Sequence, residues 1–187
     1  LASEQLSVMR DELAAYVDAG APVLAVCGGY QMLGRTWLLD GEEVPGLALL
    51  PMETHRPGTS SDRLVDDIAL ASSLAQMPVI GYENHAGRTV LDADAVPFGR
   101  VVSHTGCGNA DSCARGQAAD GIVFRNVLGT YLHGPLLAKS PEVADWLLAR
   151  ALERWAMRVG RTAPELTPLD DAEEHAANAF MARRIIR

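Results

Sequence analysis

The chain has 187 residues, of which 48% are hydrophobic and 21% are charged, a composition typical of a globular domain and not of a disordered chain. The formal net charge of −8 argues against binding to the phosphate backbone of nucleic acids. No apolar run approaches the roughly 18 residues that a membrane span needs. The three cysteines, an odd number, argue against a disulfide framework and favour a reduced cytoplasmic setting.

The first part of the chain predicts a helix, a buried strand and a second helix in succession. Apolar residues recur at helical spacing between Ser3, a suitable N-cap, and Gly20, a natural helix end. Residues 23–26 form a short apolar run, as in strands that are buried on both faces. Two glycines and a short helical segment ending at Gly34 follow. This order of elements is a unit of a parallel α/β sheet.

The middle of the chain predicts short strands separated by loops. Residues 40–62 and 104–121 are rich in glycine and other turn-forming residues, so the first segment is expected to be mostly loop and the second to be a loop. Strands are expected at 46–50, 64–70, 78–82, 88–91 and 100–103, and a hairpin over 122–132.

The C-terminal part predicts two helices joined by a linker. Ser140 as the cap and Pro141 at the first helical position predict a helix that ends near Gly160. Residues 161–170 form a linker rich in proline and threonine, and a polar, charged helix is expected over 171–187. We therefore expect a domain over residues 1–160 and a linker with a helical tail over 161–187.

Cys27 is the strongest candidate for a catalytic residue. A cysteine that follows a buried strand and precedes two glycines and a helix has the geometry of a nucleophile elbow. The positive end of the helix would favour the thiolate, and the N–H of Gly28 could stabilise an oxyanion. A single cysteine at a strand end is, however, usually a small buried hydrophobic residue.

A thiol nucleophile needs a proton acceptor, and histidine is suited to this because its pKa lies near neutrality. His133 is the best placed of the five histidines, since it follows an apolar run and precedes Gly134-Pro135. It should therefore project from the carboxyl end of a strand, the edge at which Cys27 also lies and at which open α/β sheets bind ligands. A histidine taken alone is more often a surface residue or a satisfied core residue.

Several segments, in the right order, resemble one known family. Residues 27–34, Cys-Gly-Gly-Tyr-Gln-Met-Leu-Gly, are similar to the motif C-x-G-x-Q-x-L of class I (triad) glutamine amidotransferases. Residues 131–137 resemble the histidine motif of the CobB/CobQ-like, cobyric-acid-synthase-like branch. Residues 61–64, 81–89 and 106–109 look like those of GatD-type glutaminase subunits of lipid II isoglutaminyl synthase. The resemblance extends from about residue 4 to residue 160.

The resemblance implies an α/β fold with a doubly wound, mostly parallel sheet and flanking helices, as in flavodoxin-like class I amidotransferases. It implies that the chain hydrolyses L-glutamine to glutamate and ammonia. Cys27 would attack the side-chain amide, His133 would move the protons, and the guanidinium of Arg63 would hold the substrate carboxylate. Candidate supporting residues are Gln31, Glu83 and His85.

The resemblance also implies a partner. In this family a MurT-like Mur ligase subunit forms a heterodimer with the glutaminase and uses its ammonia to amidate the D-glutamate of lipid II to D-isoglutamine in peptidoglycan synthesis. ATP and Mg²⁺ are expected in that ligase subunit, and no cofactor or metal is expected in this chain. The complex would act in the cytoplasm at the inner face of the membrane.

The sequence departs from the family pattern in three places. Pro135 stands where many members have a glutamate. The resemblance therefore implies either a Cys–His dyad or an acid supplied from elsewhere, which would be Glu83 or, as we favour, a residue of the partner subunit. The family has further strands and a glycine-rich loop ahead of the first helix, so the N-terminal strands are expected to be missing, together with the second oxyanion donor. The loop 110–120 is longer than expected. Cys107 and Cys113 could be incidental thiols, which we favour, or a redox pair, or part of a metal site.

Three other functions remain open at this point. The chain could be the amidotransferase domain of a corrinoid-amidating synthase, although no G-x-x-x-x-G-K-[ST] motif of a fused ATP-binding domain is present. It could be a non-catalytic binding module on the same fold. It could also be a cysteine hydrolase that acts on another substrate, which glutamine turnover would distinguish.

Overall fold

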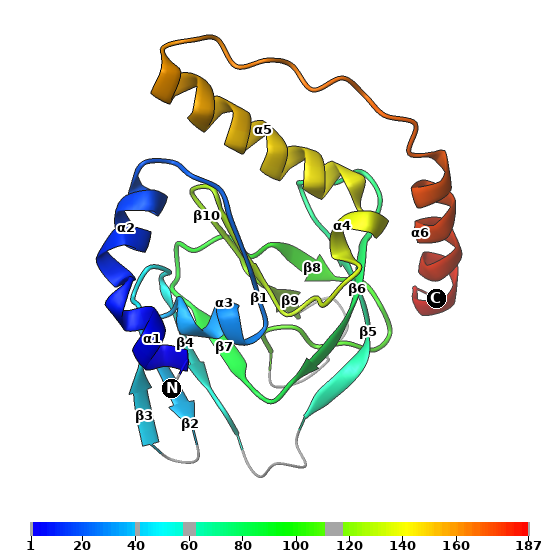
Figure 1. The fold of residues 1–187 in the computed structure, drawn as a ribbon. Coiled ribbons are helices and arrows are strands. Elements are labelled where there is room, and N and C mark those ends of the chain that lie inside the picture. Colours follow the sequence, from blue (N-terminus) through cyan, green and yellow to red (C-terminus); the bar gives the residue numbers. More distant parts are fainter. Residues whose placement is uncertain (1, 40–41, 58–62, 111–117, 187) are drawn as a thin grey trace.

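A computed structural model of the chain describes residues 2–39, 42–57, 63–110 and 118–186 (Figure 1). The helices are α1 (Ala2–Val8), α2 (Arg10–Asp18), α3 (Gly28–Met32), α4 (Leu136–Lys139), α5 (Pro141–Val159) and α6 (Ala172–Ile185). The strands are β1 (Val23–Val26), β2 (Thr36–Leu39), β3 (Glu42–Pro45), β4 (Met52–His55), β5 (Leu64–Ala71), β6 (Val79–His85), β7 (Arg88–Leu91), β8 (Gly99–Val101), β9 (Ala119–Asp120), β10 (Ile122–Phe124) and β11 (Val127–Thr130).

The strands form three small sheets with the orders β1-β11-β10, β3-β2-β4-β7 and β6-β5-β8-β9. The predicted α/β class is confirmed, with parallel pairing at β1–β11 and β2–β4. The other pairs in the described residues are antiparallel, which is more than the sequence led us to expect. Short connections such as those between β2 and β3 or β10 and β11 allow only antiparallel neighbours, whereas a parallel pair needs a long crossover.

Most of the predicted elements are confirmed, including the strand at 23–26, the short helix after Cys27 and the helix that starts at Pro141. The first helix differs, because it is interrupted at Met9 and Ser3 lies inside α1 instead of capping it. Ser140 occupies the N-cap position of α5, but its hydroxyl makes no capping hydrogen bond.

The predicted strand at 46–50 is wrong. The N–H of Leu47 donates to Met32 O, and the N–H groups of Leu49 and Leu50 donate to Leu33 O. These bonds satisfy carbonyls at the end of α3 that have no partner within the helix. Ala48 adopts a positive φ of 52°, which is incompatible with a strand. The apolar run therefore closes the end of a helix, while the strands of this region lie at 42–45 and 52–55.

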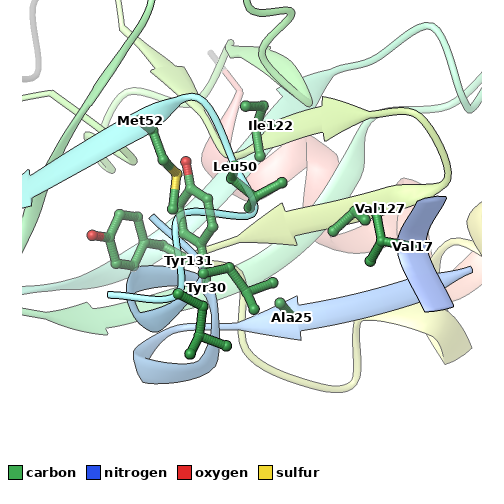
Figure 2. Close-up of a cluster of buried hydrophobic side chains, with 10 residues drawn as sticks. Val17, Ala25, Tyr30, Leu50, Met52, Ile122, Val127 and Tyr131 are labelled. Carbon is green, nitrogen blue, oxygen red and sulfur yellow. The ribbon is translucent and has the colours of Figure 1, made fainter. Parts of the chain in front are cut away.

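A cluster of buried hydrophobic side chains packs β1 against α3 and β11. Tyr30 on α3 and Tyr131 after β11 pack edge to face with ring centroids 5.2 Å apart, and both are fully buried (Figure 2). The other labelled side chains of this cluster are Val17, Ala25, Leu50, Met52, Ile122 and Val127. Burial of this apolar surface fixes α3, and with it the turn at Cys27, against β11.

The C-terminal helix α6 packs beside β5 and β6 after a linker that leaves the end of α5 (Figure 1). Asn178 on α6 is 1% exposed, and its amide nitrogen donates to the carbonyls of Pro78, at 2.8 Å, and Lys139, at 2.7 Å. Pro78 immediately precedes β6 and Lys139 ends α4, so one side chain links these two segments. No helix in the described part of the chain is long and apolar enough to span a membrane.

Candidate active site

Cys27 lies at a sharp bend between β1 and α3. Its φ of 52° and ψ of −114° are unusual for a residue with a side chain, and such strain is typical of functional positions. The Cys27 N–H donates to Thr130 O at 2.9 Å, which extends the pairing of β1 with β11 to the bend. A Cβ atom on Gly28 or Gly29 would meet nothing within 4 Å, so the space beside the bend is open. The structure therefore contains the elbow that the sequence predicts.

The thiol of Cys27 is neutral in the resting site. Burial raises the pKa of the Cys27 thiol, while a hydrogen bond from the backbone of Gly28 and the charge of Arg63 lower it by less. The expectation that the helix end alone would favour the thiolate is therefore wrong, because desolvation outweighs it. A buried neutral thiol needs a base to remove its proton when it attacks.

His133 lies at the edge of the sheet where Cys27 lies. It follows β11 by three residues, and β11 is the parallel neighbour of β1, so the two side chains leave the same end of adjacent strands. The His133 N–H donates to Tyr82 O on β6 at 2.8 Å. The sulfur of Cys27 lies 4.0 Å from Asn84 O on the same strand. The two residues thus meet the same stretch of β6, although they are not hydrogen-bonded to each other in the described chain.

The imidazole of His133 stacks on the ring of Tyr82, with centroids 5.0 Å apart and planes at 16°. Its Nε2 is buried and has no hydrogen-bond partner in the described residues. Burial lowers the pKa of His133, and the positive charges of His85 and Arg63 lower it further. His133 is therefore a neutral imidazole at pH 7, with a nitrogen free to accept a proton.

Cys27 lines a cavity of about 150 Å³ whose wall carries positive charge. The arginine side chains in this wall are those of Arg56 and Arg63, and no aspartate or glutamate is among the described residues that line it. Arg63 is held by Asn84, whose side-chain oxygen accepts from Nε at 3.1 Å and from Nη2 at 2.7 Å. A small ligand with a carboxylate group fits such a wall.

Glu83 forms a buried pair with His85, which lines the cavity, and each side chain is 1% exposed. Glu83 accepts hydrogen bonds from the N–H groups of Cys107 and Gly108, both at 2.8 Å, and contacts His85 Nε2 at 3.2 Å. With these partners, Glu83 is directed toward His85 and not toward His133. The side-chain contacts of Glu83 in the described residues are thus made with His85 and the backbone of Cys107 and Gly108, and none of them reaches His133.

Gln31 also has a supporting position. Its side-chain nitrogen donates to the hydroxyl of Tyr131 at 3.1 Å, and that hydroxyl contacts Thr89 Oγ1 at 2.8 Å. Thr89 Oγ1 in turn contacts Thr54 Oγ1 at 3.0 Å. This chain of buried polar groups ties α3 to β7 and β4. A Cβ atom on Gly87 would lie 2.1 Å from the Gln31 nitrogen, so only glycine allows this approach.

The sequence predictions missed two contributors and misjudged one cysteine. Tyr82 and Asn84 alternate with the buried residues of β6 and so share a face, which is the signal that could have marked them. Cys107 is disulfide-bonded and not an incidental thiol. Cys113, together with Ser61 and Asp62 of the quoted motifs, lies outside the described residues. No group of three metal-ligating side chains occurs within the described ranges.

Comparisons with known proteins identify the family of the chain. A family model for the CobB/CobQ-like glutamine amidotransferase domain matches residues 1–141. The chain is 40% identical over 156 residues to the lipid II isoglutaminyl synthase (glutamine-hydrolyzing) subunit GatD of Staphylococcus aureus (strain N315), covering 82% of this chain and 59% of that protein. The same subunit of Streptococcus pneumoniae (strain ATCC BAA-255 / R6) is 31% identical over 153 residues, covering 81% and 56%.

A further relative matches this chain over a smaller part of its own length. A cobyric acid synthase of Photorhabdus laumondii is 37% identical over 139 residues, which cover 67% of this chain and 26% of that protein. The chain thus spans less than two thirds of each of these relatives. A solved glutamine amidotransferase structure matches with a TM-score of 0.51 at 17% identity, covering 76% of this chain and 68% of that one. This match concerns the fold.

Proposed function

Since the chain belongs to the family of CobB/CobQ-like glutamine amidotransferase domains, we propose that it hydrolyses L-glutamine to glutamate and ammonia. The observation that carries the proposal is Cys27 at a strained strand–helix bend, in the wall of a cation-lined cavity and beside the strand that leads to His133. Glutamine is small, its carboxylate suits Arg63, and its side-chain amide is the group that a cysteine nucleophile attacks.

The reaction proceeds in two balanced halves. The Cys27 sulfur bonds to the amide carbon while its proton passes to His133, and the N–H of Gly28 stabilises the oxyanion. The carbon–nitrogen bond then breaks, and His133 returns the proton to the leaving nitrogen, so that ammonia and a thioester form. In the second half His133 takes a proton from water, the hydroxide attacks the thioester, and glutamate leaves as the thiol is restored.

The relatives indicate what consumes the ammonia. The first two bear the name of a lipid II isoglutaminyl synthase subunit, so we propose an ATP-dependent, MurT-like ligase subunit as the partner, with ATP and Mg²⁺ bound by that partner. An amidotransferase domain of a cobyric acid synthase is the second candidate, which the lower coverage by those relatives disfavours. Assays of lipid II amidation and of cobyric acid amidation with the purified complex distinguish these two candidate functions.

The partner also explains how His133 works without a local acid. Pro135 occupies the position of the usual glutamate, and Glu83 is bound to His85. A carboxylate of the ligase subunit that contacts His133 would couple glutamine hydrolysis to complex formation. The test is the rate of ammonia release by the purified protein alone and with the ligase subunit. We expect a faster rate in the complex, and equal rates would remove the partner-supplied acid while leaving glutaminase activity itself intact.

Arg63 is expected to determine glutamine affinity. Replacing it with glutamine removes a charged hydrogen-bond donor facing the substrate carboxylate, which should raise KM for glutamine about 10- to 100-fold and lower kcat much less. Arg63→Lys keeps the charge but not the planar guanidinium, so its KM for glutamine should lie between those of the wild type and Arg63→Gln. Steady-state ammonia assays measure both constants. Arg100→Gln, an exposed arginine on β8, is the matched control, and an unchanged KM in Arg63→Gln would contradict the assignment.

Tyr82 is expected to hold the His133 ring in place. Tyr82→Ala removes the stacked ring and should lower kcat about tenfold with little change in KM, because an aromatic pair is worth about 0.5–1.5 kcal/mol. Tyr82→Phe keeps the ring and should retain most of the activity. Steady-state kinetics of the two variants provide the measurement. If both variants lose activity equally, the phenol hydroxyl matters and the stack does not.

A further inference from the structure

Thr130, the last residue of β11, contacts the backbone on both sides of the proposed reaction centre. Its carbonyl oxygen accepts the N–H of Cys27 at 2.9 Å. Its hydroxyl oxygen accepts the N–H of Leu132, the residue before His133, at 3.0 Å. Thr130 is fully buried, so water cannot replace either bond. A single residue therefore links the backbone of the nucleophile to the segment that carries the base.

Asp120 holds the Thr130 hydroxyl in place. Because Thr130 Oγ1 accepts from Leu132, its own proton can be donated, and it is donated to Oδ2 of Asp120. The carboxylate also accepts the N–H of Tyr131, at 3.2 Å to Oδ1 and 3.3 Å to Oδ2. Asp120 is fully buried, and a buried carboxylate is tolerated only when it is hydrogen-bonded. Both of its oxygens are thus engaged by the segment that leads to His133.

The place of Asp120 follows from the pairing of β10 with β11. Ile122 pairs with Gly129, so the same antiparallel register extended by two residues reaches Asp120 opposite Tyr131. Here side chains take over from the strand ladder, because β11 ends at Thr130 and the next two N–H groups donate to the Asp120 carboxylate and the Thr130 hydroxyl. These bonds fix the direction in which the chain leaves the sheet.

The third N–H in this row is that of His133, which donates to Tyr82 O on β6 at 2.8 Å. Three successive backbone donors after Thr130 therefore each have a partner in the described chain. A buried N–H that loses its partner is costly, so the segment can hold only a narrow range of positions while all three bonds are made. The position of the His133 ring depends on this range, since the ring is carried by the last of the three residues.

We propose that Asp120 and Thr130 are positioning residues of the active site, which fix residues 130–133 so that the imidazole of His133 can reach the thiol of Cys27. This deepens the proposed glutaminase function and rests on it for the effect on the rate, whereas the effect on the backbone is independent of that function. Neither residue is catalytic. The Asp120 carboxylate is bonded to Thr130 and Tyr131, and neither positioning residue is among the described residues that line the Cys27 cavity.

The expected effect is on the chemical step and not on substrate binding. A shift of about 1 Å in a reacting group can lower a rate about a hundredfold. Arg63, which faces the substrate carboxylate, is held by Asn84 and not by the segment after β11. Loss of the Thr130 hydroxyl should therefore change kcat and leave KM for glutamine nearly unchanged.

A pair of variants tests the Thr130 hydroxyl. Thr130→Val has the shape of threonine but can neither accept from Leu132 nor donate to Asp120, whereas Thr130→Ser keeps both bonds. We expect Thr130→Val to lower kcat for glutamine hydrolysis about 10- to 100-fold with KM changed less than about twofold, and Thr130→Ser to retain most of kcat. Burial raises the pKa of Asp120 to about 6, so assays at pH 8 keep its carboxylate ionised. A wild-type kcat in Thr130→Val, a loss carried by KM, or an equal loss in both variants would overturn the proposal.

Asp120→Asn tests the carboxylate in the same assay. The amide keeps one acceptor oxygen but replaces the other with a donor, which then faces the Thr130 hydroxyl or the N–H of Tyr131. We expect kcat to fall about as far as in Thr130→Val, and a kcat equal to that of the wild type would overturn the role of Asp120. Should Asp120→Asn not fold, the two Thr130 variants decide the outcome.

Ser103→Ala is the matched control for general loss of stability. Ser103 is buried, and its hydroxyl, like that of Thr130, has one donor and one acceptor as partners: it accepts from the N–H of Ala69 at 3.1 Å and donates to Thr105 O at 2.5 Å. Ser103→Ala should therefore lose stability as Thr130→Val does but keep the wild-type kcat. An equal fall in kcat in Ser103→Ala would show that destabilisation alone explains the loss, and would overturn the proposal.

The effect on the backbone can be measured without any activity, by amide hydrogen exchange followed by NMR. We expect the amides of Leu132 and His133 to exchange at least about tenfold faster in Thr130→Val than in the wild type, and at the wild-type rate in Ser103→Ala. Unchanged exchange at both amides in Thr130→Val would overturn the proposal. Should the wild-type protein release no ammonia from glutamine, the proposed function fails, and the exchange rates still test whether Thr130 fixes this segment.

Discussion

Replacing Cys27 with alanine is expected to lower glutamine hydrolysis by at least about a thousandfold, because the thioester cannot form without the sulfur. The stability of the fold should change little. Alanine, like cysteine, is a residue with a Cβ atom, so the backbone strain at φ 52° is the same in both proteins. Ammonia release from glutamine and thermal unfolding of the two proteins are the measurements.

A thiol-reactive glutamine analogue provides the control for this variant. It should label the wild-type protein on Cys27 and leave Cys27→Ala unlabelled, since Cys27 is the free cysteine of the described chain and Cys107 is disulfide-bonded. Retained hydrolysis in Cys27→Ala would place the nucleophile elsewhere. Binding of glutamine by Cys27→Ala without turnover would agree with the assigned roles of both Cys27 and Arg63.

Gly121→Ala is expected to have the largest effect on stability, lowering the free energy of unfolding by more than about 3 kcal/mol. Gly121 has a φ of 66°, and a Cβ atom there would lie 2.1 Å from Gly129 O on the paired strand β11. Backbone cannot rotate away as a side chain can, so β10 and β11 would have to separate. Chemical denaturation monitored by circular dichroism measures the loss.

Gly160 provides a matched control for this prediction. It ends α5 with a φ of 65°, nearly that of Gly121, but a Cβ atom there would meet nothing within 4 Å. Gly160→Ala therefore carries the backbone strain alone and should cost about 1 kcal/mol. The difference between the two variants isolates the packing of β10 against β11. Equal losses would mean that the close approach at Gly121 relaxes freely.

Local patterns were sufficient to predict the elbow at Cys27 and the helix after Ser140. Each depends on neighbours in the sequence, namely an apolar strand followed by glycines, or a proline at the first helical position. The segment at 46–50 was mispredicted because an apolar run looks the same whether it pairs in a sheet or, like Leu47 and Leu50, closes the end of α3. That choice depends on tertiary contacts.

The supporting part of the site was beyond local reasoning for the same reason. Glu83 receives its hydrogen bonds from Cys107 and Gly108, which lie 24 and 25 residues further along the chain. No spacing rule predicts such a contact, so the sequence left open whether Glu83 or a residue of the partner subunit serves His133. His133, by contrast, could be placed beside Cys27 from topology, because the ends of adjacent parallel strands meet at one edge.

The amide of Asn178 has a practical consequence for anyone who shortens this chain. A boundary drawn where the family match stops, at residue 141, would discard the helix that carries this side chain. The carbonyls of Pro78 and Lys139 would lose their donor, and the apolar surface of Ile80 and Ala69 beneath Ile185 would be uncovered. The family match thus ends before the last helix that packs on the domain, and expression vectors should extend through residue 186.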